Sequence, residues 1–295
     1  MINQIFFKLY KFTFHITERV LPTLAADWAV HIFCTVRKFK QFNTSGFSLK
    51  PSSEQKVIFP SQYQMEKQSP YYVKYRFGKG KKVLLIHGWE GRASQMDRFI
   101  KPLVDAGFEV WAIDLPAHGN TLGRRTNLPE MVQAILHLAD NIGKFHTILA
   151  HSFGGVVAIN AIKAGVKTEN LITIGTPASM KFILSDFKEK LQASDKLMIR
   201  FREEIENFIH QKFEDFSPDK ILLKLSVVGL IVHDRDDKEV DYRQAVELHE
   251  KWPQSKLILT CGLGHRRMLR NRKMISQIIE FVQELQKQYQ KEAVA

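Results

Sequence analysis

The chain is poor in cysteine, with only Cys34 and Cys261 in 295 residues. Two cysteines give no disulfide framework, which fits a reducing compartment such as the cytoplasm. No apolar run is long enough to span a bilayer. Lys8 and Lys11 interrupt the apolar stretch near the N-terminus, so we expect no secretory signal. These features predict a cytoplasmic protein.

Several kinds of ligand site are also missing from the sequence. It has no glycine-rich phosphate loop and no dinucleotide fingerprint, and its His, Cys, Asp and Glu residues show no spacing typical of zinc ligands. The formal net charge is +12, but the lysines are scattered rather than gathered with aromatic residues as in a nucleic-acid module. We therefore expect no cofactor, no metal and no nucleic-acid partner, and make no prediction of the oligomeric state.

The segment from Ala150 to Gly155, AHSFGG, joins a β-rich apolar run to a run of small and apolar residues. A strand therefore ends, turns sharply through Ser152 and becomes a helix. This is the pattern of a nucleophile elbow, in which strained backbone points the serine hydroxyl out of the fold. The glycines let strand and helix backbones approach, and the Phe153 N–H faces the position of an oxyanion. Taken alone, the segment also fits an ordinary glycine-rich turn.

An acid and a histidine follow the serine, in the order that sheet enzymes with such an elbow use. Residues 225–232 read as a buried strand that ends just before three carboxylates, and residues 256–260 read as a strand that precedes His265. The ends of parallel strands meet at one edge of a sheet, where such folds place their ligand crevices. The sequence therefore predicts that Ser152, an acid and His265 come together there.

A fourth motif follows the apolar run of residues 82–86, which ends in His87, Gly88 and Trp89. The loop after such a strand supplies the second N–H of an oxyanion hole. Gly88 permits the turn, so the Trp89 N–H is the candidate donor beside that of Phe153. We expect His87 to brace the loop. The candidate substrate contacts around the site are His87, Gly88, His118 and His151.

Together these motifs resemble the α/β-hydrolase superfamily, and within it the single-domain bacterial members related to the serine aminopeptidase and lysophospholipase branch. The resemblance spans roughly residues 70–285, with Ala150 where the elbow usually has a glycine. It implies a mostly parallel central sheet flanked by helices. It also implies a serine hydrolase that cleaves a small-molecule ester or thioester. The motifs that carry it are His87-Gly88-Trp89, residues 114–119, the Ser152 elbow, the Asp237 loop and residues 264–267.

The resemblance also bears on the choice of acid. Three neighbouring carboxylates cannot all approach one imidazole without repulsion. The family has an Asp followed three residues later by Val, which Asp237 and Val240 match; Asp234 is the reserve. In the implied mechanism His265 takes the proton of Ser152, Asp237 orients the imidazole, and water hydrolyses the acyl-enzyme.

The coarse pattern divides the chain into three parts. Strand and helix patterns alternate over residues 51–177 and 222–290, which predicts the α/β-hydrolase core. Residues 178–221 show apolar residues at helical spacing and no strand pattern, which predicts a helical cap inserted after the sixth strand. The aromatic side chains of this cap form either its own core or the lining of an acyl pocket.

Residues 1–50 form the third part, a predicted basic amphipathic helical segment with seven basic residues and two acidic ones. Ile5, Leu9, Phe12 and Ile16 recur on one face of the expected helix. Such a helix lies on an anionic membrane surface, or it packs across the hydrolase body with its lysines in water. The sequence leaves both arrangements open.

The function predicted from these motifs is the hydrolysis of a carboxylic ester or thioester. One alternative keeps the chemistry but takes a lysophospholipid or other lipid ester at the inner membrane face, contacted through the N-terminal helix. Another is a non-catalytic protein of the same fold that binds a ligand or partner. A peptidase with Glu90 or Glu203 holding a substrate amine follows from the resemblance only.

Overall fold

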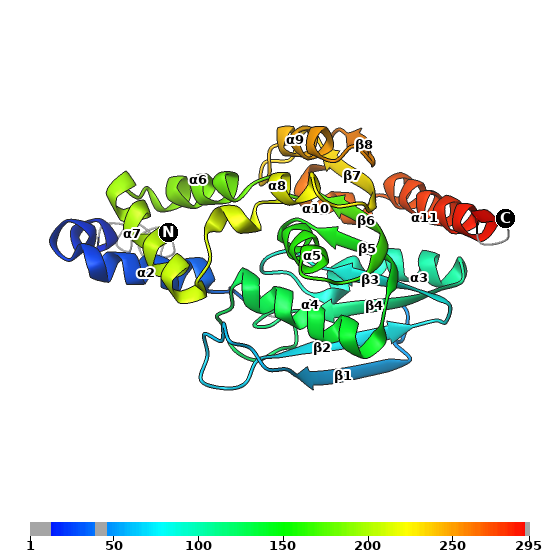
Figure 1. Cartoon of the computed structure of the whole chain (residues 1–295), viewed down its shortest axis with the longest axis horizontal. Coiled ribbons are helices and arrows are strands. Elements are labelled where there is room, and N and C mark those ends of the chain that lie inside the picture. Colours follow the sequence, from blue (N-terminus) through cyan, green and yellow to red (C-terminus); the bar gives the residue numbers. More distant parts are fainter. Residues whose placement is uncertain (1–12, 39–45, 293–295) are drawn as a thin grey trace.

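An eight-stranded sheet forms the centre of the computed structural model, which describes residues 13–38 and 46–292. Its strand order is β1-β2-β4-β3-β5-β6-β7-β8 (Figure 1). The first two strands pair antiparallel at one edge, β2 pairs antiparallel with β4, and every later pair is parallel. The strands are β1 (Ser53–Ile58), β2 (Tyr71–Phe77), β3 (Lys81–Ile86), β4 (Phe108–Asp114), β5 (Phe145–His151), β6 (Thr168–Ile174), β7 (Val228–Asp234) and β8 (Ser255–Thr260).

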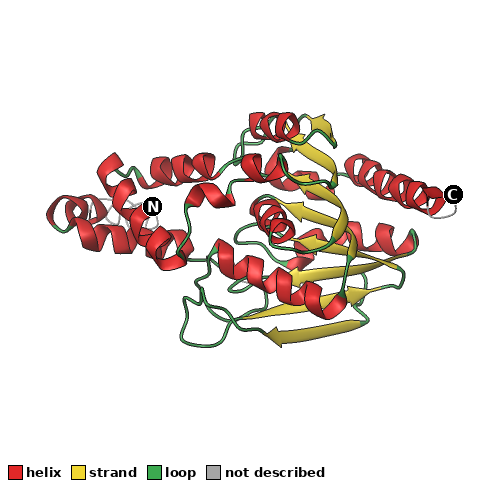
Figure 2. Cartoon of the chain, in the orientation of Figure 1, coloured by secondary structure: helices red, strands yellow, loops and turns green. Residues whose placement is uncertain are grey.

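Helices cover both faces of this sheet (Figure 2), so its central strands are buried on both sides. β4 and β5 are buried at every residue, as expected for central strands of a sheet that is covered on both faces. Two apolar clusters form the core, one on each face. One face carries α4 (Leu128–Ile142), α5 (Phe153–Lys163), α8 (Pro218–Leu222) and α9 (Arg243–Lys251), and the other α3 (Asp97–Asp105) and α11 (Arg272–Glu292).

Helices also fill the connection between β6 and β7, which confirms the predicted insertion after the sixth strand. They are α6 (Met180–Leu191), α7 (Asp195–Ile209), the 3₁₀ turn η2 (Phe213–Phe216) and α8. Serine side chains start two of them, since Ser179 and Ser194 each accept a hydrogen bond from the backbone N–H three residues on. Whether these helices act as a cap stays a prediction.

The N-terminal part contains two helices in its described residues, one over residues 13–20 and α2 (Pro22–Cys34). α2 packs against α7 (Figure 1), and Phe14, Ala25 and Ala29 are completely buried. The described part therefore packs on the inserted helices. Ile5, Leu9 and Phe12 of the predicted amphipathic face lie outside the described residues, so membrane contact stays a prediction.

None of the helices within the described ranges is long and apolar enough to cross a membrane.

One predicted boundary is wrong. The strand expected over residues 225–232 runs from Val228 to Asp234, so Asp234 ends the strand instead of following it. An uninterrupted apolar run does not mark where pairing starts, and here the Val227 carbonyl accepts a hydrogen bond from Trp252 Nε1 instead of joining the ladder (2.9 Å).

Candidate active site

The strand order reverses between β3 and β5, and this position sets the site. Open α/β sheets bind their ligands beyond the carboxyl ends of the strands at such a switch point. Ile86 pairs with Ala150 across these two strands, so the loops after them leave the sheet side by side. These loops carry Gly88 and Ser152, respectively.

Ser152 occupies the sharp turn between β5 and α5. Its backbone has φ 52° and ψ −127°, a sparsely populated positive-φ conformation that costs a non-glycine residue about 1–3 kcal/mol. The backbone is held on both sides, because Ser152 N–H donates to Ile174 O (2.8 Å) and its carbonyl accepts from Thr176 Oγ1 (3.1 Å). The hydroxyl has no hydrogen-bond partner within the described part of the chain.

The two glycines after Phe153 allow the close approach that the sequence predicts. A Cβ at Gly154 would lie 2.3 Å from His87 O, and one at Gly155 would lie 2.1 Å from Thr176 Oγ1. Any side chain at either position would push α5 away from the neighbouring strands. The start of α5 is therefore held tightly beneath the loop that follows β3.

The two predicted oxyanion donors are the backbone amides of Phe153 and Trp89. The Phe153 N–H belongs to the first helical residue of α5 and so has no acceptor inside the helix. Neither it nor the Trp89 N–H donates a hydrogen bond to any residue in the ranges that the structure describes. Gly88 is pressed close to the serine, since a Cβ there would lie 2.9 Å from Ser152 Cβ.

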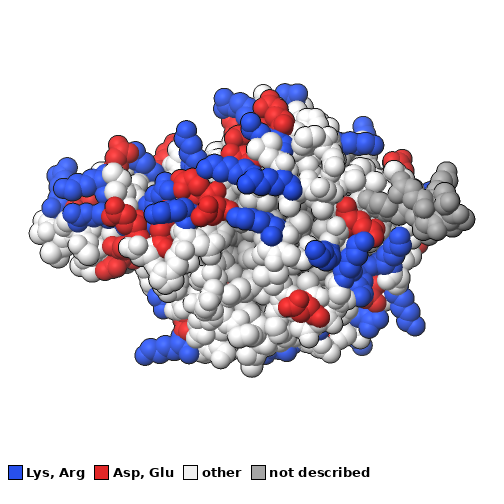
Figure 3. All heavy atoms as spheres, in the orientation of Figure 1, with Lys and Arg blue, Asp and Glu red and all other residues white. Residues whose placement is uncertain are grey.

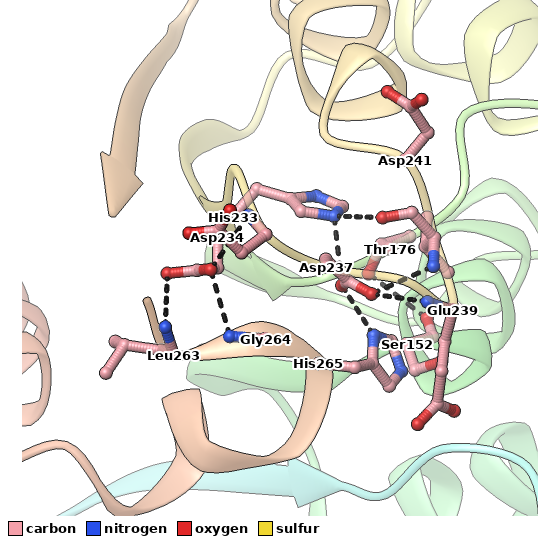
Figure 4. Close-up of polar contacts among 12 residues, drawn as sticks. Ser152, Thr176, His233, Asp234, Asp237, Glu239, Asp241, Leu263, Gly264 and His265 are labelled. Carbon is pink, nitrogen blue, oxygen red and sulfur yellow. Dashed lines mark hydrogen bonds and ion pairs between the residues drawn. The ribbon is translucent and has the colours of Figure 1, made fainter. Parts of the chain in front are cut away.

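His265 and Asp237 form a short, buried pair. His265 Nδ1 lies 2.7 Å from Asp237 Oδ2, and the His265 ring lies beside Ser152 (Figure 4). The other carboxylate oxygen, Asp237 Oδ1, accepts from the backbone N–H groups of Glu239 (2.8 Å) and Val240 (2.9 Å). Burial alone would raise the pKa of Asp237, but the hydrogen bonds from His233 and His265 and the electrostatic interaction with the His265 ring hold it well below its ordinary value.

A second histidine, which the sequence reading did not single out, also reaches this carboxylate. His233 is completely buried near the end of β7. Its Nε2 lies 2.8 Å from Val240 O and 3.2 Å from Asp237 Oδ2. The ring therefore supports the Asp237 loop from the side away from His265 (Figure 4). Its position four residues before Asp237, on the adjoining strand, was the available signal.

Asp234, the reserve acid, has another task. Its carboxylate accepts hydrogen bonds from Thr260 Oγ1 (2.7 Å) and from the backbone N–H groups of Leu263 (3.1 Å) and Gly264 (2.9 Å). Burial opposes ionisation, but these hydrogen bonds lower the pKa of Asp234 overall. Asp234 thus fixes the loop that carries His265, and it is Asp237 that contacts the His265 ring.

The four candidate substrate contacts separate into two groups. Gly88 and His151 line a cavity that also contains Ser152 and His265. His151 Nε2 donates to His265 O (3.1 Å), and its ring lies 4.7 Å from the His265 ring. Burial and the nearby His265 lower the pKa of His151 to about 3, so it is neutral around pH 7.

His87 and His118 are completely buried and lie behind the cavity wall, so the expectation that they contact substrate is corrected. His87 Nδ1 donates to Gly88 O (2.7 Å) and its Nε2 accepts from Leu115 N–H (3.2 Å). The His118 ring meets the Trp89 ring edge to face at 5.2 Å. Both histidines therefore support the loop that carries Gly88 and Trp89, as expected for His87.

The cavity has a volume of about 1280 Å³. Most of its charged lining residues are exposed, including Arg37, Arg266 and Arg270, and the inserted helices contribute mainly apolar side chains to the lining. Lys and Arg alternate with Asp and Glu over the inserted helices on the face shown in Figure 3. Within residues 13–38 and 46–292, no group of three or more His, Cys, Asp or Glu side chains has the geometry of a metal site.

Comparison with known proteins identifies the fold. Residues 83–202 match the family model described as the alpha/beta hydrolase family. A human protein described as serine hydrolase-like is 35% identical over 85 residues. That stretch covers 27% of this chain and 41% of the relative, so the chain matches less than half of the relative's length.

Solved structures agree over a larger part of the chain. A carboxylesterase structure from Nitrososphaera gargenis has a TM-score of 0.61 at 19% identity, covering 79% of this chain and 100% of that one. A bromoperoxidase from Bacillus anthracis has a TM-score of 0.60 at 16% identity, with 79% and 100% covered. An esterase from Exiguobacterium antarcticum has a TM-score of 0.57 at 17% identity, with 72% and 96% covered. The predicted resemblance and fold class are confirmed; the narrower branch of the superfamily stays a prediction.

Proposed function

On this α/β-hydrolase fold, we propose that the protein is a serine hydrolase that cleaves a carboxylic ester or thioester through an acyl-enzyme. The observation that carries the proposal is the buried Asp237–His265 pair beside a serine in a strained strand-to-helix turn. A strained backbone and a buried carboxylate–imidazole pair both cost folding free energy, and both are typical of sites that activate a nucleophile. The esterases among the structural relatives support the same reaction class.

Each group has one role in the proposed reaction. His265 Nε2 accepts the proton of the Ser152 hydroxyl as the serine oxygen attacks the carbonyl carbon. Asp237 holds Nδ1 as the donor and stabilises the imidazolium that forms. The N–H groups of Trp89 and Phe153 bind the oxyanion. His265 then protonates the leaving group, and a water molecule deprotonated by His265 releases the acid.

The first test is covalent labelling with a fluorophosphonate, followed by mass spectrometry of the labelled peptides. We expect one adduct per folded chain, located on Ser152, because within residues 13–38 and 46–292 only this serine lies beside an imidazole that is held by a carboxylate. Denatured protein serves as the control and is expected to remain unlabelled. Labelling at another residue, or none in the folded protein, would contradict the proposal and favour the non-catalytic, ligand-binding alternative.

The proposed oxyanion hole gives a second prediction. Gly88→Ala places a Cβ 2.9 Å from Ser152 Cβ and 3.2 Å from His151 O, so the loop that carries the Trp89 N–H has to move. Loss of one oxyanion donor typically costs about 10²–10³-fold in kcat, and we expect a loss of that size with little change in KM. The measurement is steady-state hydrolysis of a soluble ester, with thermal unfolding to establish that the variant is folded. An unchanged kcat in folded protein would rule out this loop as the donor.

A further inference from the structure

The cavity at Ser152 extends far beyond the reacting groups, into the space between the N-terminal helix and the insertion. The same cavity that contains Ser152 and His265 is lined by Phe33 of α2, by Ile183 and Phe187 of α6, and by Ile209 of α7. Its volume of about 1280 Å³ exceeds the range of roughly 300–1,000 Å³ typical of small-molecule sites. A small acyl group would leave most of this space unfilled.

The far part of the cavity is lined mainly by apolar side chains, although Asp186 and Lys190 of α6 and His31 of α2 also belong to the lining. Phe33, Ile183 and Phe187 are half-buried although each packs against the apolar core, and Phe182 is half-buried as well. Apolar surface left open to a cavity is stabilised when an apolar ligand covers it, by about 25 cal/mol per Å². Most of the charged lining residues are exposed, such as Arg266 and Glu239, which pair at 3.1 Å, while Glu90 and Asp186 are half-buried. An elongated substrate would therefore enter with its apolar end inward.

α2 is a fixed wall of this space. The Phe33 ring meets the rings of Phe187 at 5.0 Å and Phe201 at 5.3 Å, which joins α2 to both α6 and α7 (Figure 1). The chain after α2 is anchored as well, because Val36 N–H donates to Arg124 O (2.7 Å). The wall is thus built from a segment that precedes the first strand of the sheet.

The same segment is tied to the proposed oxyanion loop. Arg37 Nε lies 2.7 Å from Glu90 Oε1, and Glu90 directly follows Trp89. Although an exposed ion pair adds little stability by itself, this one fixes where the wall meets the reacting groups. Glu90 also has a positive φ of 57°, so the backbone at this junction is constrained.

We propose that α2, α6 and α7 enclose an acyl-chain chamber, so that the substrate is an ester or thioester of a long-chain fatty acid. This inference rests on the proposed hydrolase chemistry at Ser152. The acyl chain lies along Phe33 and Ile183 and the carbonyl carbon lies at Ser152, while the leaving group remains at the charged, exposed part of the cavity.

The test is the acyl-length profile of kcat/KM for p-nitrophenyl esters, from acetyl to dodecanoyl, below the concentrations at which they form micelles. In the wild type, each added methylene is expected to raise kcat/KM by up to about four-fold until the chamber is filled. Ile183→Trp fills the chamber and is expected to shift the optimum to shorter chains. Phe33→Ala opens it and is expected to shift the optimum to longer ones. Phe208→Ala, at an exposed aromatic on α7 outside the cavity lining, is the matched control and should leave the profile unchanged.

A binding measurement separates the chamber from the chemistry. The Ser152→Ala variant is titrated with the fluorescent fatty acid parinaric acid, and Ile183→Trp in the same background is expected to weaken binding at least ten-fold. Hydrolysis of acetyl and long-chain esters at equal rates, with no binding of the fatty acid, would overturn the chamber and leave the hydrolase standing. Binding without hydrolysis of any ester would overturn the hydrolase and leave the chamber standing. Thermal unfolding of each variant establishes that it is folded. If Phe33→Ala loosens α2, the Ile183→Trp variant still tests the chamber, because it leaves Phe33 in place.

Discussion

Replacing Ser152 by alanine is expected to lower kcat for ester hydrolysis by at least about 10⁴-fold and to abolish fluorophosphonate labelling. The reason is that no other side chain supplies the attacking oxygen, while the two backbone N–H groups and the cavity remain. These account for the residual acceleration over water that triad variants typically keep. The measurement is steady-state hydrolysis with enough enzyme to detect this residual activity, after purification that excludes host esterases.

Ser226→Ala is the matched control for this loss, because Ser226 is exposed and lies apart from the cavity lining. It is expected to retain full activity. Alanine at position 152 keeps the strained backbone at φ 52°, so its thermal unfolding should stay close to that of the wild type. Activity within ten-fold of the wild type in pure Ser152→Ala would show that another group is the nucleophile.

The local motifs made much of the fold and the site predictable from the sequence. An elbow, a strand end and a short loop each depend on neighbours in the chain, so the positions of Ser152, His265 and the acid loop follow from a few residues. The choice between Asp237 and Asp234 had to come from the family spacing. In the structure the choice follows from the hydrogen bonds of the two carboxylates. Asp234 accepts hydrogen bonds from the backbone of the loop that holds His265, and Asp237 contacts the His265 ring.

Long-range packing was the part that the sequence left open. The sequence allowed the aromatic residues of the insertion to form either its own core or the lining of an acyl pocket. Phe201 is completely buried in the core, while Phe182 and Phe187 line the cavity, whose use as an acyl pocket stays a prediction. That Phe33 completes this lining depends on α2 folding onto α7 across more than 150 residues of chain, which no local period encodes. Likewise, only tertiary structure shows that His118 lies behind Trp89 and that His233 reaches Asp237.

Asp237→Asn is expected to lower kcat about 10⁴-fold, the typical cost of imposing the wrong tautomer on a triad histidine. The structure fixes how the new amide sits. Asp237 Oδ1 accepts from two backbone N–H groups, those of Glu239 and Val240, so the Asn oxygen occupies that side. Its NH₂ group then faces His265 Nδ1 and donates to it. The proton of the ring moves to Nε2, which can no longer accept the proton of Ser152.

Asp234→Asn is the matched control, the same isosteric change three residues earlier in the same connection. Here the new NH₂ group is a donor that faces other donors, whereas the carboxylate accepts hydrogen bonds from them. We therefore expect a loss of stability of about 1–3 kcal/mol with a much smaller loss of kcat. Thermal unfolding and kcat measured on both variants separate the two roles. If Asp234→Asn lowers kcat more than Asp237→Asn does, the assignment of the acid is reversed.

The acid limb of the stability profile tests the same pair. The pKa of Asp237 is held below its ordinary value in the folded protein, so its contribution to stability is fully present above about pH 4, the range of an unfolded Asp. That contribution is lost as the pH falls through the lower folded pKa, where the carboxylate takes up a proton. When the pH is lowered from 5, the free energy of unfolding of Asp237→Asn should therefore fall less than that of the wild type. The measurement is urea denaturation of both proteins at pH intervals of about 0.5. Parallel curves for the two proteins would mean that the Asp237–His265 pair does not stabilise the ionised carboxylate.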